Sequence, residues 1–176
     1  MLQEKIRKRI RDVADYPKPG IIFKDITPVL ADPALMREIV TEMTGIWKNE
    51  RIDAIAAIEA RGFILGAILA HELNCAFLPI RKTGKLPYTT RSEEYALEYG
   101  TSAVEMHTDA VHEGMRVLVH DDLLATGGTA SAAAKLVKAS GGVIAGFSFL
   151  INLSFLPGEG KLVSEFGIRP NCLINY

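Results

Sequence analysis

The stretch VLVHDDLLATGGT, residues 117–129, decides how this sequence folds. Its apolar first half predicts a β-strand over residues 116–120, bounded by two carboxylates. The following Ala-Thr-Gly-Gly-Thr turn leads into a helix expected over residues 129–139, closed by Gly141-Gly142. A strand that passes through a glycine turn into a helix is typical of an α/β protein.

The turn itself has the composition of an anion-binding site. Gly127 and Gly128 let the backbone approach a ligand without a Cβ in the way. Successive N–H groups and the helix N-terminus favour negative charge, and Thr126 and Thr129 add hydroxyl donors. No GK[ST] follows the glycines and the GxGxxG pattern is absent, so this is neither a Walker A loop nor a dinucleotide fingerprint.

Asp121 and Asp122 restrict which anion fits. Two carboxylates would repel a phosphate placed on them, so the ligand should offer them sugar hydroxyls or a hydrated cation. A ribose 5-phosphate meets both demands. The alternative is a capped turn with two solvated acids and no ligand.

A second candidate site follows another strand, in IEARGF at residues 58–63. The strand over 54–58 runs into Glu59, Ala60 and Arg61, where backbone N–H groups and one guanidinium suit a second phosphate. Arg61 could equally start a helix and pair with Glu59. Basic residues after the next strand add positive charge, unless they are only a solvated loop: Arg81, Lys82 and Lys85.

Around these motifs, short apolar runs alternate with helical patterns. Strands are expected over 54–58, 76–80, 116–120 and 143–151, and helices over 2–14, 33–48, 62–73 and 129–139. This order predicts one α/β domain with a mostly parallel central sheet flanked by helices, and ligands at the carboxyl ends of its strands. The long polar segment between Ile80 and Arg116 is expected to form a β-hairpin, a lid over the site, or both.

Composition limits the partners. Twenty Lys and Arg against 21 Asp and Glu provide no global field for nucleic acid or an anionic membrane. The longest apolar run, residues 62–70, is shorter than the roughly 20 residues that cross a bilayer. Cys75 and Cys172 form no metal-binding pattern and are expected to be buried free thiols. The basic N-terminus reads as a surface helix rather than a transit sequence, so we expect a cytoplasmic protein that binds small molecules.

Several motifs resemble a known family. VLVHDDLLATGGT resembles the site for 5-phosphoribosyl 1-diphosphate (PRPP) of type I phosphoribosyltransferases. The form DDLLATGGT is similar to adenine phosphoribosyltransferases, as are PKPGIIFKDITPVL, IEARGF, IRKTGKLPYTT and EYALEYG. The resemblance covers nearly the whole chain. It implies the type I fold, with a small N-terminal hood at about residues 1–32 and a flexible loop at about 82–108 over the site.

The resemblance also implies an activity. The enzyme would join adenine to PRPP in purine salvage, giving AMP and diphosphate through an oxocarbenium-like transition state. Mg²⁺ would be held through PRPP and water rather than by protein ligands, and the enzyme would be a homodimer.

Residue roles follow from the same resemblance. Asp121 and Asp122 would hold the ribose hydroxyls, and the 5-phosphate cradle would consist of Ala125, Thr126, Gly127, Gly128 and Thr129. The residues expected at the diphosphate are Ala60 and Arg61, with Arg81, Lys82 and Lys85 from the same or the neighbouring subunit.

The adenine residues are implied in the same way. Ile22, Phe23 and Lys24 would frame the base, with Phe23 stacking on it, although an Arg is frequent where this chain has Lys24. Glu98 would exchange a proton at N7, and Tyr99 would help to close the loop. Without the resemblance, Phe23 reads as packing and Glu98 as one of four loop carboxylates expected to be exposed: Glu93, Glu94, Glu98 and Glu105.

Two rival functions remain open at this stage. The PRPP motif does not specify a base, so an enzyme for hypoxanthine, guanine or xanthine is one alternative. A regulator that binds PRPP without turnover is the other. The EYALEYG and IIFKD segments favour adenine, and Glu98 favours turnover. The four histidines form no spaced cluster, and His120 is expected beside the PRPP loop.

Overall fold

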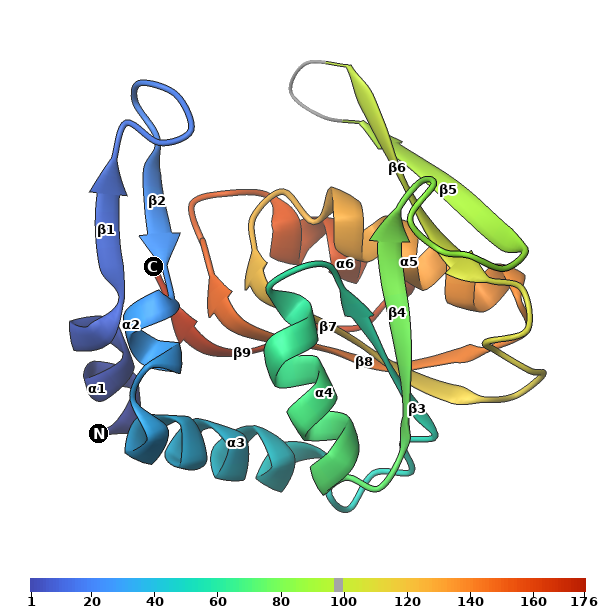
Figure 1. Ribbon diagram of the computed structural model, residues 1–176, viewed down its shortest axis with the longest axis horizontal. Helices are drawn as coiled ribbons and strands as arrows, with labels where there is room; N and C mark the ends of the chain where they lie inside the picture. Colours follow the sequence, from blue (N-terminus) through green and yellow to red (C-terminus); the bar gives the residue numbers. More distant parts are fainter. Residues whose placement is uncertain (97–99) are drawn as a thin grey trace. The chain divides into compact units, whose positions relative to one another are not determined.

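The computed structural model describes residues 1–96 and 100–176, which form two compact units, Met1–Ile46 and Trp47–Tyr176 (Figure 1). In residues 1–96 and 100–176, no helix is both long enough and apolar enough to span a bilayer.

The first unit differs from its predicted pattern near the N-terminus. Helix α1 spans Leu2–Arg9 and gives way to strand β1, Arg11–Ala14, so the helix predicted over 2–14 is too long. Strand β1 pairs antiparallel with β2, Ile22–Asp25, and this ladder satisfies backbone groups that a longer helix would have satisfied internally. The short helix α2, Thr27–Leu30, precedes α3, Pro33–Trp47, which confirms the helix predicted over 33–48.

In the second unit, the described residues form a seven-stranded sheet of order β5-β6-β4-β3-β7-β8-β9. Its strands are β3 Ala54–Ile58, β4 Ala76–Lys82, β5 Thr90–Ala96, β6 Thr101–His107, β7 Arg116–Leu124, β8 Val143–Asn152 and β9 Asn171–Asn175. Strands β4, β3, β7, β8 and β9 run parallel, and β5 and β6 form an antiparallel hairpin at the edge. The predicted sheet and the predicted hairpin are both confirmed.

In the described part of the second unit, three helices flank this sheet: α4 Gly62–Glu72, α5 Gly128–Ala139 and α6 Gly158–Phe166. The connection through α4 leads from β3 to β4, whereas α5 leads from β7 to β8 in the opposite direction along the sheet. Because such crossovers are right-handed, α4 covers one face and α5 the other, where α6 also lies (Figure 1). The strand order therefore reverses between β3 and β7, and a ligand crevice is expected at the carboxyl ends of these two strands.

Strand β7 is longer than predicted. It was expected to end at His120, but it runs to Leu124 because β8 continues beside it, pairing Leu123 with Ile151 and Leu124 with Asn152. Asp121 and Asp122 therefore belong to the strand, which holds their backbone rigidly. Helix α6 and strand β9 were not predicted.

Candidate active site

The cradle predicted between β7 and α5 depends on a close approach of two glycines. Gly127 adopts a left-handed φ of 78°, and a Cβ added there would lie 3.0 Å from the carbonyl oxygen of Gly158. The N–H of Gly158 in turn donates to the carbonyl of Ala125 at 3.0 Å. Helix α6 thus supports the cradle from outside. Sequence reasoning missed this support, although Pro157-Gly158 is a signal for a turn or a helix start.

The predicted ribose-phosphate residues meet at one cavity. It has a volume of about 80 Å³ and lies at the carboxyl end of β7. The predicted residues that line it are Asp121, Ala125, Thr126, Gly127, Gly128 and Thr129. A left-handed turn leading into a helix N-terminus is an arrangement that binds phosphate, so the cavity can hold the anion that its sequence predicts.

Asp122 connects this cavity to the second predicted site. Its carboxylate is buried, and its Oδ2 lies 3.0 Å from Nε of Arg61, which follows β3. The backbone N–H of Asp122 donates to Oδ1 of Asp121 at 2.8 Å. Gly62 allows α4 to begin here, because a Cβ at this position would lie 2.8 Å from Oδ1 of Asp121. The ends of β3 and β7 therefore form one continuous polar site.

Burial shapes the charge of this acidic pair. It raises the pKa of Asp121 well above its ordinary value, and the neighbouring charge of Asp122 raises it further. Burial also raises the pKa of Asp122, against the opposing effect of the Arg61 guanidinium. Burial thus opposes ionisation of both carboxyls, whereas the Arg61 guanidinium favours the charged form of Asp122, and carboxyl oxygens in either form can bind the hydroxyls of a ligand.

Glu59 organises the basic residues that follow β4. Its Oε2 accepts from Nε of Arg81 at 2.8 Å, and its Oε1 accepts from the backbone N–H of Lys82 at 2.7 Å. Nζ of Lys85 lies 3.5 Å from the same carboxylate. Burial by itself would raise the pKa of Glu59, but the bonds from Lys82 and Arg81 hold it below its ordinary value.

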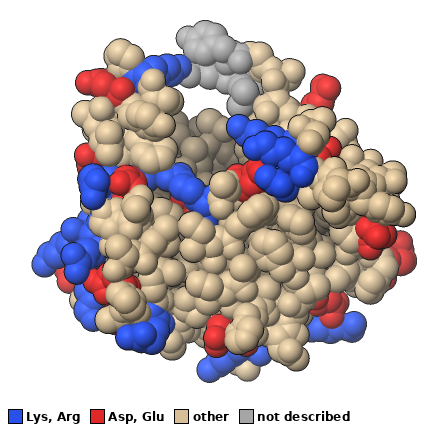
Figure 2. Space-filling view, in the orientation of Figure 1, with Lys and Arg blue, Asp and Glu red and all other residues tan. Residues whose placement is uncertain are grey.

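The predicted basic residues are therefore gathered rather than scattered along a solvated loop. Figures 1 and 2 have the same orientation. At the position of the upper end of β4 in Figure 1, Figure 2 shows Lys and Arg atoms beside an acidic group. The alternative pairing of Arg61 with Glu59 is not the arrangement found, since Arg61 forms its ion pair with Asp122.

The predicted adenine residues lie on β2 of the first unit. Ile22 is 58% exposed, whereas the ring of Phe23 packs edge-on against Tyr16 with centroids 5.2 Å apart. Nζ of Lys24 lies 2.7 Å from Oδ1 of Asp12 on the neighbouring strand. Lys24 thus has a structural ion pair, which is consistent with a role for its backbone rather than its side chain at the base.

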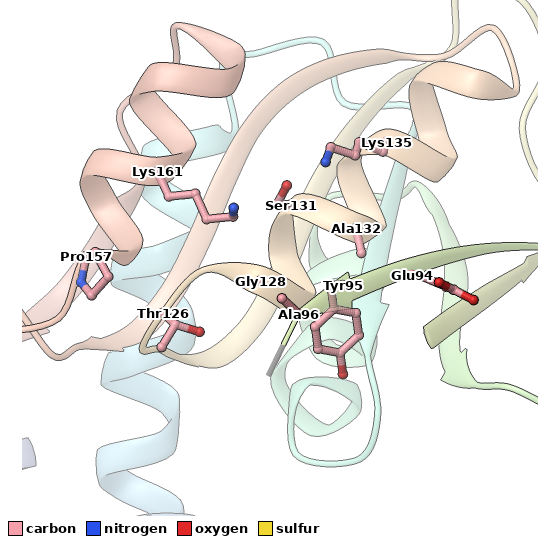
Figure 3. A pocket seen from close by; sticks show the side chains of 10 residues that line it. All are labelled: Glu94, Tyr95, Ala96, Thr126, Gly128, Ser131, Ala132, Lys135, Pro157 and Lys161. Atoms are coloured by element: carbon pink, nitrogen blue, oxygen red, sulfur yellow. The ribbon is translucent and has the colours of Figure 1, made fainter. Parts of the chain in front are cut away.

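Glu98 and Tyr99 lie outside the described residues, but the strand that leads to them is placed. Strand β5 ends at Ala96, and a Cβ added to Gly128 would lie 3.2 Å from Cδ2 of Tyr95. Figure 3 shows Tyr95 and Ala96 beside Gly128, at a second cavity of about 500 Å³. The end of β5 therefore lies beside Gly128 of the predicted phosphate cradle.

His120 precedes the acidic pair but is enclosed in the sheet. It is completely buried within β7, and burial lowers its pKa to about 4. It is therefore neutral at physiological pH and contributes to packing beside the site.

Because His120 is buried in its neutral form, we expect the stability of the folded protein to depend on pH. Its folded pKa of about 4 lies below the ordinary 6.5 expected in the unfolded chain. As pH falls, the unfolded state therefore takes up the proton first. The contribution of neutral His120 to the free energy of unfolding is full above pH 6.5 and is lost towards pH 4. The loss should reach about 3 kcal/mol.

Denaturant unfolding from pH 7 to pH 4 of the natural chain and of His120→Leu would measure this loss. Asp121 and Asp122 titrate in both proteins, so their effects largely cancel in the difference. A constant difference between the two free energies of unfolding would contradict the prediction.

Comparison with known proteins gives a family that agrees with the geometry of the sheet and of the turn after β7. The model of the phosphoribosyl transferase domain family matches residues 28–154. Together with the parallel sheet and the cradle after β7, this match defines the class: a phosphoribosyltransferase.

Individual relatives narrow the class. The adenine phosphoribosyltransferase of Cytophaga hutchinsonii is 53% identical over 176 residues, covering 100% of this chain and 97% of the relative. The crystal structure of the adenine phosphoribosyltransferase of Thermoanaerobacter pseudethanolicus has a TM-score of 0.95 at 49% identity, over 100% of both chains. That of Saccharomyces cerevisiae, complexed with D-2,5-dideoxy-2,5-imino-altritol 1,6-bisphosphate and adenine, has a TM-score of 0.89 at 30% identity, over 98% of each chain.

The chain belongs to the adenine phosphoribosyltransferase family, an assignment that confirms the resemblance seen in its motifs. It is a purine salvage enzyme that makes AMP from adenine and PRPP. Adenine specificity and catalysis are thereby favoured over the oxopurine enzyme and the PRPP-binding regulator.

Proposed function

We propose that PRPP binds along the carboxyl ends of β3 and β7. The observation that carries this assignment is the cavity of about 80 Å³ at which Asp121 and the cradle residues 125–129 meet. The 5-phosphate occupies the cradle, and the ribose hydroxyls meet Asp121 and Asp122. The diphosphate extends towards Ala60 and Arg61 and towards the residues that Glu59 holds, which are Arg81 and Lys85 through their side chains and Lys82 through its backbone.

The reaction needs charge stabilisation more than covalent chemistry. The bond from C1 of the ribose to the diphosphate breaks, the electron pair leaves with the diphosphate, and an oxocarbenium-like ribose remains. Adenine that carries its ring proton on N7 then attacks C1 through the lone pair of N9 from the opposite face, and the N7 proton passes to Glu98 as the new bond forms. Arg61 and the neighbouring cations stabilise the charge that develops on the leaving group, while Glu98 exchanges a proton at N7.

Mg²⁺ is proposed to arrive with PRPP. Among residues 1–96 and 100–176, no three His, Cys, Asp or Glu side chains gather as a ligand set for a metal. Ribose hydroxyls, diphosphate oxygens and water can supply the oxygen ligands that Mg²⁺ prefers, with the acidic pair nearby. When bound, the ion neutralises charge on the diphosphate.

Asp122→Asn tests this assignment. The substitution keeps the side-chain shape but removes the charge that faces Arg61 and weakens the acceptor for a ribose hydroxyl. We expect calorimetry with PRPP and Mg²⁺ to show binding about 10- to 100-fold weaker, since a hydrogen bond to a charged group contributes roughly 1.5–3 kcal/mol.

Asp109→Asn is the matched control, because Asp109 is exposed and follows β6 at the end of the hairpin opposite to Tyr95 and Ala96, which lie near Gly128. It should bind PRPP like the natural chain. Undiminished affinity in Asp122→Asn would remove Asp122 from the PRPP site.

The adenine and loop assignments remain predictions. We propose that Ile22, Phe23 and Lys24 frame the base as part of a hood at about residues 1–32, within a single phosphoribosyltransferase domain. We also propose that the segment at about 82–108, whose described part contains the β5–β6 hairpin, covers the site and that Tyr99 helps to close it. Exclusion of water from the activated sugar is the physical benefit of such a cover.

A homodimer is supported by helix α4. Its sequence GFILGAILAHE is apolar along most of its length, yet only part of it packs into the sheet. Ile64 remains 40% exposed and Ala67 is also exposed, so the helix presents apolar surface that a second subunit can cover. Sedimentation velocity at micromolar concentration tests the proposal, and a monomer would contradict it.

We also propose a cytoplasmic location, since both cysteines are free thiols.

A further inference from the structure

Glu105 is a buried carboxylate in a position where sequence reasoning expected an exposed one. It lies on β6 and is only 3% exposed. Its Oε1 accepts three hydrogen bonds, each of 3.1 Å, from the consecutive backbone N–H groups of Gly84, Lys85 and Leu86. The turn between β4 and β5 is thus folded around one oxygen of Glu105.

Three successive N–H groups that converge on one point form an anion-binding concavity. In this turn the anion is supplied by the protein itself. Gly84 permits the geometry with a φ of +84°. Since a hydrogen bond to a charged acceptor is stronger than a neutral one, Glu105 is a strong constraint on the turn.

The same turn carries the cations that are proposed to meet the diphosphate. Nη1 of Arg81 donates to the carbonyl of Lys85 at 3.1 Å, so the guanidinium is tied to the turn. Glu59 holds Arg81 and the backbone of Lys82 at the other end. The segment from Arg81 to Leu86 is therefore fixed between two carboxylates, one after β3 and one on β6.

We propose that Glu105 is a positioning residue for PRPP: by holding the N–H groups of residues 84–86, it aims the side chains of Arg81 and Lys85 at the diphosphate. This inference rests on the proposed role of these cations. Glu105 itself is engaged by the turn and does not touch the substrate. Its loss should therefore weaken PRPP binding while leaving the adenine subsite unchanged.

Steady-state kinetics of two variants test the inference. Glu105→Ala removes the acceptor and should raise KM for PRPP about tenfold or more, with KM for adenine and kcat at saturating PRPP nearly unchanged. Glu105→Gln keeps a side-chain oxygen in place of Oε1 and should restore most of the affinity for PRPP. Equal changes in both KM values, or no recovery in Glu105→Gln, would show a general structural role and overturn the inference.

Lys85→Ala separates this inference from the proposed function. If Lys85→Ala raises KM for PRPP and Glu105→Ala does not, the positioning role is wrong while the diphosphate site stands. If Lys85→Ala leaves KM for PRPP unchanged, the role of Lys85 at the diphosphate fails and the inference fails with it. In the Glu105→Ala background, Lys85→Ala should add less than it does alone, because the misplaced lysine no longer contributes.

Discussion

Replacing Glu98 by alanine is expected to lower kcat by about 10²- to 10⁴-fold, the usual contribution of a general acid or base. The affinity for PRPP should change little, because the proposed role concerns N7 of adenine only. Glu98 lies between β5 and β6, and the end of β5 approaches Gly128 of the cradle through Tyr95. The chain therefore enters the segment that contains Glu98 beside Gly128, in the turn that is proposed to hold the 5-phosphate. Steady-state kcat and calorimetry with PRPP measure the two effects separately.

Glu94→Ala is the matched control for this prediction. Glu94 has the same side chain, lies on β5 and is exposed, and Figure 3 shows it pointing away from Thr126 and Gly128. Its replacement should leave kcat within a factor of about two, as expected for a surface carboxylate. Unchanged turnover in Glu98→Ala would remove Glu98 from the mechanism, and an equal loss in both variants would indicate a general effect of charge on the hairpin.

Gly127→Ala is expected to disrupt the phosphate cradle. A left-handed conformation costs a non-glycine residue roughly 1–2 kcal/mol. The new Cβ would also lie 3.0 Å from the carbonyl oxygen and 3.1 Å from Cα of Gly158, and neither backbone atom can rotate away. With overpacking at roughly 1–3 kcal/mol, the total penalty is about 2–5 kcal/mol. The cradle should shift to relieve it, and KM for PRPP should rise by at least tenfold.

Gly160→Ala provides the control for this second prediction. Gly160 lies in α6, two residues beyond Gly158, and an added Cβ meets nothing within 4 Å. Alanine in a helix interior is favoured over glycine by roughly 0.5–1 kcal/mol, so this variant should be slightly more stable and fully active. Thermal unfolding and KM for PRPP compare the two variants. A Gly127→Ala enzyme with natural KM and stability would show that the cradle does not depend on the left-handed turn.

Local patterns predicted the parallel sheet and the cradle because both depend on neighbours in sequence. The apolar run 54–58 becomes the fully buried β3, and the helix after Gly127 begins within one residue of its predicted start. The hairpin at residues 90–107 was one of two predicted alternatives. By contrast, residues 11–14 continue the helical apolar spacing of α1, but their pairing with residues 22–25 prevails. Propensity is a weak guide where a ladder can form.

Contacts between distant segments were the part that no local pattern could predict. From the sequence, Arg61 could be assigned to a phosphate or to Glu59, yet in the structure it pairs with Asp122, which lies on the adjacent strand β7. Glu105 was grouped with exposed loop acids. The residues around it in the sequence do not reveal that a turn 19 to 21 residues earlier folds over its carboxylate. The strand order of the sheet determines which distant residues become hydrogen-bond or ion-pair partners.

The sequence by itself determined the class of the protein, because its motifs resemble those of one family over nearly the whole chain. It also predicted an anion-binding turn after an acidic strand end, through backbone chemistry that neighbouring residues encode. It also determined the alternation of strands and helices, since hydrophobic periodicity is local. Only the tertiary structure decided that α6 supports the cradle through Gly158, that Arg61 pairs with Asp122, and that Glu105 holds the turn carrying Lys85. These contacts join segments far apart in the chain, and packing in three dimensions selects them.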